Sequence, residues 1–198
     1  MNYQKWEKIL IKEIWRLWDK SDKFLPCHGP EHHIRVWKNA EKFGLKKKAD
    51  MGVLLASCLL HDVVAYNQSS EKGHDLASAK MAIKILQKIK FPQAKIKLVE
   101  ENIMLHRTKK QVGKNLEGAI MKSFDKIDCF GATGVYRIIT PITIRKWGIK
   151  KCINYFLHQG HIKAKWEAIV FPELKKKYKK DYQYTVDYFK QLAKELGL

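Results

Sequence analysis

The segment Leu59-Leu60-His61-Asp62 ends an apolar run with an imidazole and a carboxylate on adjacent residues. The run predicts a helix from Met51 to about Val64 that is buried on most sides, with Asp50 placed to cap its first turn. A carboxylate at the end of so apolar a helix is costly unless it is paired or bound to a metal ion. The pair therefore indicates either an ion site or a capping histidine beside a salt-bridged aspartate.

A second helix is expected upstream, beginning at Pro30 and ending at about Phe43, where Gly44 follows. Its histidines, His32 and His33, are adjacent and lie on neighbouring faces of the helix. They cannot both serve the same purpose. The residues alone leave open which of the two faces His61 and Asp62.

Helical periodicity continues along the rest of the chain. Further helices are expected over residues 3–20, 77–89, 92–106, 115–130 and 149–156, with one or two more in 166–196. The sequence has no internal repeat, low-complexity tract or strand-rich region. It therefore predicts an all-α fold.

Two downstream positions carry chemistry on such helices. His106 ends an apolar stripe, so it is either a buried, hydrogen-bonded histidine or an active-site group. Asp125 and Asp128 lie three residues apart and therefore on one side of a helix. His74 falls in a polar segment expected to be a loop.

Composition limits the class of protein. With 39 basic and 20 acidic residues, the 198-residue chain has a formal charge of +19, which favours an anionic partner or simply a solvated surface. The four cysteines form no CxxC pair, so a zinc knuckle or dithiol redox motif is not supported. No apolar run reaches the length of a membrane span, and the charged N-terminus does not match a signal peptide. We expect a cytoplasmic protein with no membrane partner.

Read in order, His32, His61-Asp62 and Asp125 resemble the ligand set of the HD-domain metal-dependent phosphohydrolase superfamily. The similarity is to its stand-alone bacterial hydrolases and covers residues 28–137, from His28-Gly29-Pro30-Glu31-His32 to Asp125-Lys126-Ile127-Asp128. It implies one domain over residues 1–198, a bundle of about eight helices around a central metal site, with C-terminal helices in 138–198. Family spacing favours His32 over His33 as the ligand.

The resemblance implies a divalent cofactor. Two imidazoles and two carboxylates, from His32, His61, Asp62 and Asp125, suit Mn²⁺, Fe²⁺, Co²⁺ or Ni²⁺. Such an ion would polarise a phosphoryl oxygen and activate a water for attack on phosphorus. One ion per chain is expected; the alternative is a second ion held by His74 and His106.

Further roles follow for residues near the ligands. Asp62 and His106 are the expected catalytic residues, His106 for proton transfer or charge stabilisation. The expected substrate-binding residues are His28, Arg35, Lys126 and Arg137. Each of the three cations could instead form a salt bridge to Asp62, Asp125 or Asp128.

Two departures from the family pattern weaken any transfer of substrate specificity. Residues 63–66, after His61-Asp62, contain no acidic residue, so the general base is undefined and an alarmone hydrolase is disfavoured. In the closing block, Ser123-Phe124-Asp125 stands where relatives often have Asp-Ala-Asp.

The expected function is hydrolysis of a phosphate ester or anhydride, with a nucleotide or another phosphorylated small molecule as substrate: a nucleotidase or a nucleoside triphosphate pyrophosphohydrolase. The alternatives are an HD-type nuclease or cyclic-nucleotide phosphodiesterase, and a basic nucleic-acid-binding protein with an inactive site. A monomer or a homodimer is expected.

Overall fold

The computed structural model describes residues 3–20, 26–65, 73–107, 115–144 and 147–198. These residues are overwhelmingly helical and contain no strand, which confirms the all-α prediction. They form two compact units, residues 1–124 and 125–198. The boundary between the units falls inside one continuous helix, α6.

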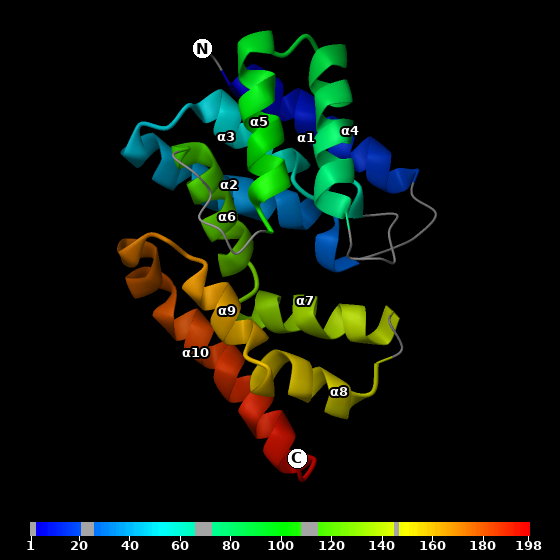
Figure 1. Cartoon of the computed structure of the whole chain (residues 1–198), viewed down its shortest axis with the longest axis vertical. Coiled ribbons are helices and arrows are strands. Elements are labelled where there is room, and N and C mark those ends of the chain that lie inside the picture. Colours follow the sequence, from blue (N-terminus) through cyan, green and yellow to red (C-terminus); the bar gives the residue numbers. More distant parts are fainter. Residues whose placement is uncertain (1–2, 21–25, 66–72, 108–114, 145–146) are drawn as a thin grey trace. The chain divides into compact units, whose positions relative to one another are not determined.

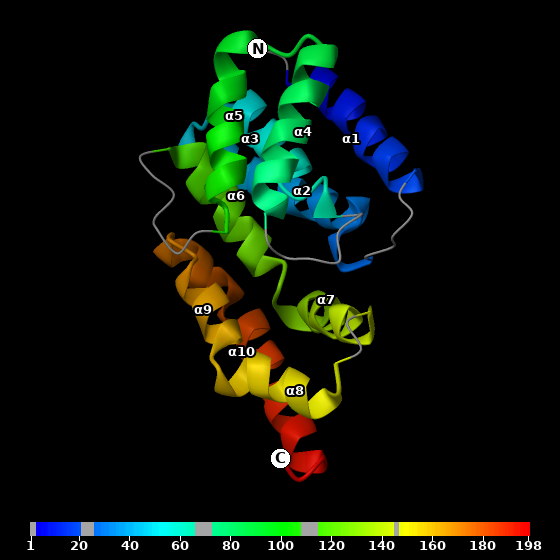
Figure 2. The ribbon, with the colours of Figure 1, turned by 45° about the vertical axis from the view of Figure 1, so that its right-hand side comes forward.

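The described residues of the first unit form six helices, of which α6 crosses the boundary, and a short 3₁₀ turn. Figure 1 labels these helices. Their bounds are α1 Gln4–Asp19, η1 Pro26–His28, α2 Pro30–Lys47, α3 Met51–Leu60, α4 His74–Lys88, α5 Gln93–Leu105 and α6 Leu116–Ile127. Helices α4 and α5 lie side by side in both views (Figures 1 and 2), and α3 packs against α1, α2, α4 and α5. The helix carrying the His-Asp pair is therefore the centre of this unit.

Helix α3 is buried on every side, as its apolar sequence predicts. All residues from Gly52 to Leu60 are buried, and four leucines among them are fully enclosed. Burying each leucine contributes about 1.5–3 kcal/mol relative to exposure. The N-terminal cap is also as predicted, because the Asp50 carboxylate accepts hydrogen bonds from the backbone N–H groups of Gly52 and Val53.

Helix α2 is longer than expected: it does not end at Phe43 but continues to Lys47, with Lys48 as a left-handed C-cap. Gly44 is buried within it, and a Cβ at this position would overlap the Cδ2 atom of Leu54 on α3. Gly44 therefore permits close packing of α2 on α3 and is not a helix terminator.

Helices α3 and α6 are shorter than expected. The regular helix α3 ends at Leu60, not at Val64, and turns follow in which the Ala65 N–H donates to the carbonyl of Asp62. His61 and Asp62 thus stand at a helix end, where their side chains can diverge from the helix. Helix α6 ends at Ile127 instead of residue 130. Other observed bounds differ from the expected ones by a few residues, as is usual for helix ends.

A polar network fixes α6 to α3 and α5. The backbone N–H of Asp50 donates to the Glu117 carboxylate at 2.7 Å. The buried Asn102 amide donates to Ser57 Oγ at 3.0 Å and accepts from Asn115, whose oxygen caps the first turn of α6. Because these buried polar groups satisfy one another, the network sets the position of α6 at its N-terminal end.

The second unit continues from α6 through α7 (Gly131–Ile144), α8 (Ile149–Ile153) and a π-helical turn (Asn154–His158). It ends with α9 (His161–Glu167) and α10 (Pro172–Glu195). Helices α7, α8 and α9 all contact α10 (Figure 2). The Phe130 ring packs edge-on against Trp166 and Tyr182, which stack on each other.

Candidate metal centre

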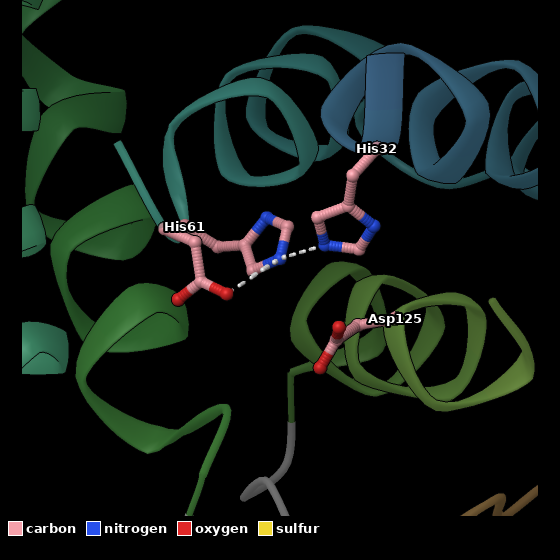
Figure 3. Close-up of side chains that lie close together, drawn as sticks. His32, His61 and Asp125 are labelled. Atoms are coloured by element: carbon pink, nitrogen blue, oxygen red, sulfur yellow. Dashed lines mark hydrogen bonds and ion pairs between the residues drawn. The ribbon is translucent and has the colours of Figure 1, made fainter. Parts of the chain in front are cut away.

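Four buried side chains meet at the end of α3. His32 of α2, His61 and Asp62 after α3, and Asp125 of α6 each offer one ligand atom, and these atoms all lie within 4.8 Å of one another. Figure 3 shows His32, His61 and Asp125 pointing toward a common space from three different elements. The four predicted ligands are thus brought together, and His32, not His33, is the member of the group on α2.

A hydrogen bond to a backbone carbonyl fixes which ring nitrogen of His61 faces the cluster. Its Nδ1 lies 2.9 Å from the carbonyl oxygen of Cys58, an acceptor only, so Nδ1–H donates and Nε2 carries the lone pair when the ring is neutral. This Nε2 lies 3.2 Å from His32 Nε2 and 3.6 Å from Asp62 Oδ2. A ring N–H held by a backbone carbonyl is the usual orientation of a histidine that binds a metal.

The Asp62 carboxylate is buried and remains charged. Burial by itself would raise its pKa, but the imidazoles of His61 and His106 outweigh that effect and lower the pKa of Asp62 well below its usual value. Its Oδ1 is buried and faces the Nε2 atoms of His74 and His106 at 3.1 and 3.2 Å. A buried anionic oxygen among imidazole nitrogens fits a divalent ion, because these are the donor types that such an ion takes as ligands.

A second group shares Asp62 with two more histidines. Asp62 Oδ1 lies 3.1 Å from His74 Nε2 and 3.2 Å from His106 Nε2. His106 Nδ1 faces the carbonyl oxygen of Ile103 at 2.6 Å, so its Nδ1–H donates there. His74 was expected in a loop but is the first residue of α4, and its Nδ1 lies 3.4 Å from the Arg107 guanidinium.

The expected substrate-binding cations divide into two kinds. Lys126 Nζ lies 2.6 Å from Asp125 Oδ2, and Arg137 Nη1 lies 3.1 Å from Asp128 Oδ2, so both form the salt bridges that were the alternative to phosphate contacts. The Arg137–Asp128 pair is buried. Arg35 is partly exposed on α2.

His28 and His33 take different environments. His28 is 27% exposed, and its Nε2 lies 3.6 Å from Asp62 Oδ2. His33 is fully buried with its ring 4.9 Å from that of His61; burial first, then the nearby His61 and His32 rings, lower its pKa well below the usual value. His33 is therefore a neutral packing residue behind the cluster.

One neighbour of the cluster was not foreseen. The Sγ atom of buried Cys27 lies 3.0 Å from His28 Nδ1. The only signal in the sequence is that Cys27 directly precedes His28, which by itself does not place the thiol against the ring.

Comparisons with known proteins identify the family and the fold. Residues 30–129 match the HD domain family. Among solved structures, an HD-superfamily hydrolase from Bacillus thuringiensis is 19% identical, with a TM-score of 0.70 and coverage of 99% of each chain. Bacillus subtilis YpgQ, crystallised with ADP, is 16% identical with a TM-score of 0.72, covering 98% of this chain and 97% of its own.

A third structure, described as a predicted HD-superfamily hydrolase from an uncultured Thermotogales bacterium, is 19% identical with a TM-score of 0.65 and covers 96% and 92% of the two chains. No curated protein sequence matches the chain. Among the described residues, no helix is both long and apolar enough to cross a membrane. The family match spans the cluster from His32 to Asp125, so the chain belongs to the HD-domain superfamily of metal-dependent phosphohydrolases.

Proposed function

We propose that this chain hydrolyses a phosphate ester or anhydride of a nucleotide, with one divalent metal ion held by His32, His61, Asp62 and Asp125. The observation that carries the proposal is the meeting of these four buried ligand atoms within 4.8 Å. Two imidazoles and two carboxylates suit Mn²⁺, Fe²⁺, Co²⁺ or Ni²⁺. When bound, such an ion polarises a phosphoryl oxygen and acidifies a coordinated water.

The chain's own residues supply positioning and proton transfer. His106 is held by the carbonyl of Ile103 through Nδ1–H, so its Nε2 is the atom that gains or loses a proton beside Asp62. In the protonated form it can transfer that proton to a leaving oxygen. Lys126, paired with Asp125, adds positive charge at the edge of the cluster.

The contact between Arg107 and His74 favours a single ion. A guanidinium can only donate, so His74 Nδ1 accepts and, in the neutral ring, Nε2 keeps its proton toward Asp62. A protonated nitrogen is not a metal ligand. This contact supports an ion-pairing role for Asp62, His74 and His106, although their ligand atoms also lie within 4.8 Å of one another, and we propose one ion, at the first group.

A nucleotide is the substrate class that fits best. A phosphate chain complements the strongly positive chain, and the solved relative YpgQ carries ADP. The expected phosphate donors are Lys126, which pairs with Asp125, and the partly exposed Arg35 and His28.

The test is a substrate panel on the purified chain with Mn²⁺. Nucleoside triphosphates, diphosphates and monophosphates, cyclic nucleotides and single-stranded nucleic acid are compared by release of phosphate, pyrophosphate or nucleotide. We expect nucleoside phosphates to be turned over with the largest kcat/KM, and chelation to abolish turnover.

The matched variants are Asp125→Asn in the cluster and Asp187→Asn on the exposed face of α10. Asp125→Asn is expected to lower kcat/KM at least 100-fold, and Asp187→Asn to leave it unchanged. Turnover that survives both chelation and Asp125→Asn would refute the metal-dependent mechanism. Preferential cleavage of single-stranded nucleic acid would refute the nucleotide assignment and favour a nuclease.

A further inference from the structure

The Cys27 thiol contacts His28, a partly exposed histidine at the edge of the cluster. Cys27 closes the short 3₁₀ turn η1 together with His28, and its side chain is buried. Its Sγ lies 3.0 Å from His28 Nδ1, while His28 Nε2 faces the Asp62 carboxylate at 3.6 Å. The His28 side chain is 27% exposed, so its inner edge lies where the cluster meets solvent.

The proton on the His28 ring is decided by this contact. A thiol is a weak donor and a weaker acceptor, whereas an unprotonated imidazole nitrogen is a good acceptor. The favourable arrangement has Cys27 S–H donating to His28 Nδ1, which leaves the ring proton on Nε2. Transfer of the thiol proton to the ring protonates both ring nitrogens, so an Nε2–H group still faces Asp62.

The result is opposite to that for His61. The Nδ1–H group of His61 donates to the carbonyl oxygen of Cys58, so in the neutral ring its Nε2 carries the lone pair. His28 turns an N–H toward the same region. Its inner edge therefore suits an acceptor, such as a phosphoryl oxygen, and not a cation.

We infer that Cys27 is a positioning residue that holds His28 with its proton on Nε2, so that His28 donates to a phosphoryl oxygen bound beside Asp62. The substrate half of this inference rests on the proposed function; the tautomer half does not. A hydrogen bond from a ring N–H to an anionic oxygen is stronger than one between neutral groups, which makes the orientation of His28 relevant to affinity.

The tautomer is measured directly by long-range ¹H–¹⁵N NMR of the full chain loaded with diamagnetic Zn²⁺. In the wild type we expect the His28 ring to be protonated at Nε2 and unprotonated at Nδ1. Cys27→Val removes the donor at similar volume and is expected to shift the Nδ1 resonance. Cys27→Ser keeps a donor and is expected to restore it. Cys152→Val, at a buried thiol of α8, is the control and leaves His28 unchanged.

Inorganic phosphate is the probe for the substrate contact. Titration into the Zn²⁺-loaded chain is expected to move the His28 Nε2–H signal. Cys27→Val is expected to weaken phosphate binding about threefold to tenfold, with Cys27→Ser close to the wild type. His28→Leu is expected to weaken binding about tenfold or more, whereas His28→Gln, which keeps a side-chain N–H, is expected to lose less.

Two outcomes overturn the inference. A wild-type His28 protonated at Nδ1 and unprotonated at Nε2 would refute the role of Cys27, and phosphate affinity unchanged in His28→Leu would refute the substrate contact. Both measurements are independent of turnover. A chain with the expected tautomer and phosphate contact but no hydrolysis would refute the proposed function alone.

Discussion

Replacing Arg137 by Met is expected to destabilise the second unit strongly. Arg137 and Asp128 are both largely buried and lie 3.1 Å apart, so removing the guanidinium leaves a carboxylate that water does not compensate. Loss of one partner from a buried pair costs about 3–5 kcal/mol. That corresponds to roughly a thousandfold change in the unfolding equilibrium constant at the middle of the range.

The double-mutant cycle separates this role from phosphate binding. Asp128→Leu alone is expected to cost a similar amount, since it leaves the guanidinium buried. The double variant Arg137→Met/Asp128→Leu is expected to recover most of the loss, because two apolar side chains replace the pair. Urea unfolding followed by circular dichroism measures all four corners of the cycle.

The outcome that contradicts this reasoning is specific. If Arg137→Met costs less than about 1 kcal/mol, the value of an exposed pair, while the KM for a nucleotide rises tenfold, then Arg137 contacts substrate phosphate and its bridge to Asp128 is not structural. The control is Lys163→Met, which breaks an exposed ion pair with Glu167. This substitution is expected to lower the unfolding free energy by well under 1 kcal/mol.

Three further changes have defined outcomes. Asp62→Asn is expected to weaken divalent-metal binding by at least about 100-fold in calorimetric titration, because loss of a residue that only hydrogen-bonds to a ligand already lowers metal affinity about 10–100-fold. An unchanged affinity would show that Asp62 is not a ligand. Gly134→Ala places a Cβ onto the backbone carbonyl of Cys129 and is expected to lower the unfolding free energy by about 3 kcal/mol, whereas Gly148→Ala, with open space around it, is expected to change it by less than about 0.5 kcal/mol. Because the pKa of His33 is lowered in the native chain, the unfolded chain takes up a proton below about pH 6.5 that the native chain excludes. The metal-free protein is therefore expected to lose stability as pH falls from about 6.5. The slope from this group is at most about 1.4 kcal/mol per pH unit. His33→Leu is expected to flatten that slope in urea titrations at pH 5 to 7, and an unchanged slope would contradict it.

Part of this site was determined by the sequence alone. The apolar run before His61 and Asp62 dictates a buried helix whatever surrounds it, and the Asp50 carboxylate caps that helix by a local interaction within three residues. The order of His32, His61-Asp62 and Asp125 likewise carries the family assignment.

The tertiary structure decided the pairings. The choice of His32 over His33 depends on how α2 rotates against α3, where Gly44 and Leu54 fit together. Packing also brings Arg137 of α7 to Asp128, nine residues away, whereas the contacts of Lys126, His28, His61 and His106 with Asp125, Cys27, Cys58 and Ile103 are local ones within three residues. Helical periodicity fixes which face a residue occupies, but a hydrogen-bond partner on another element exists only after the helices have packed.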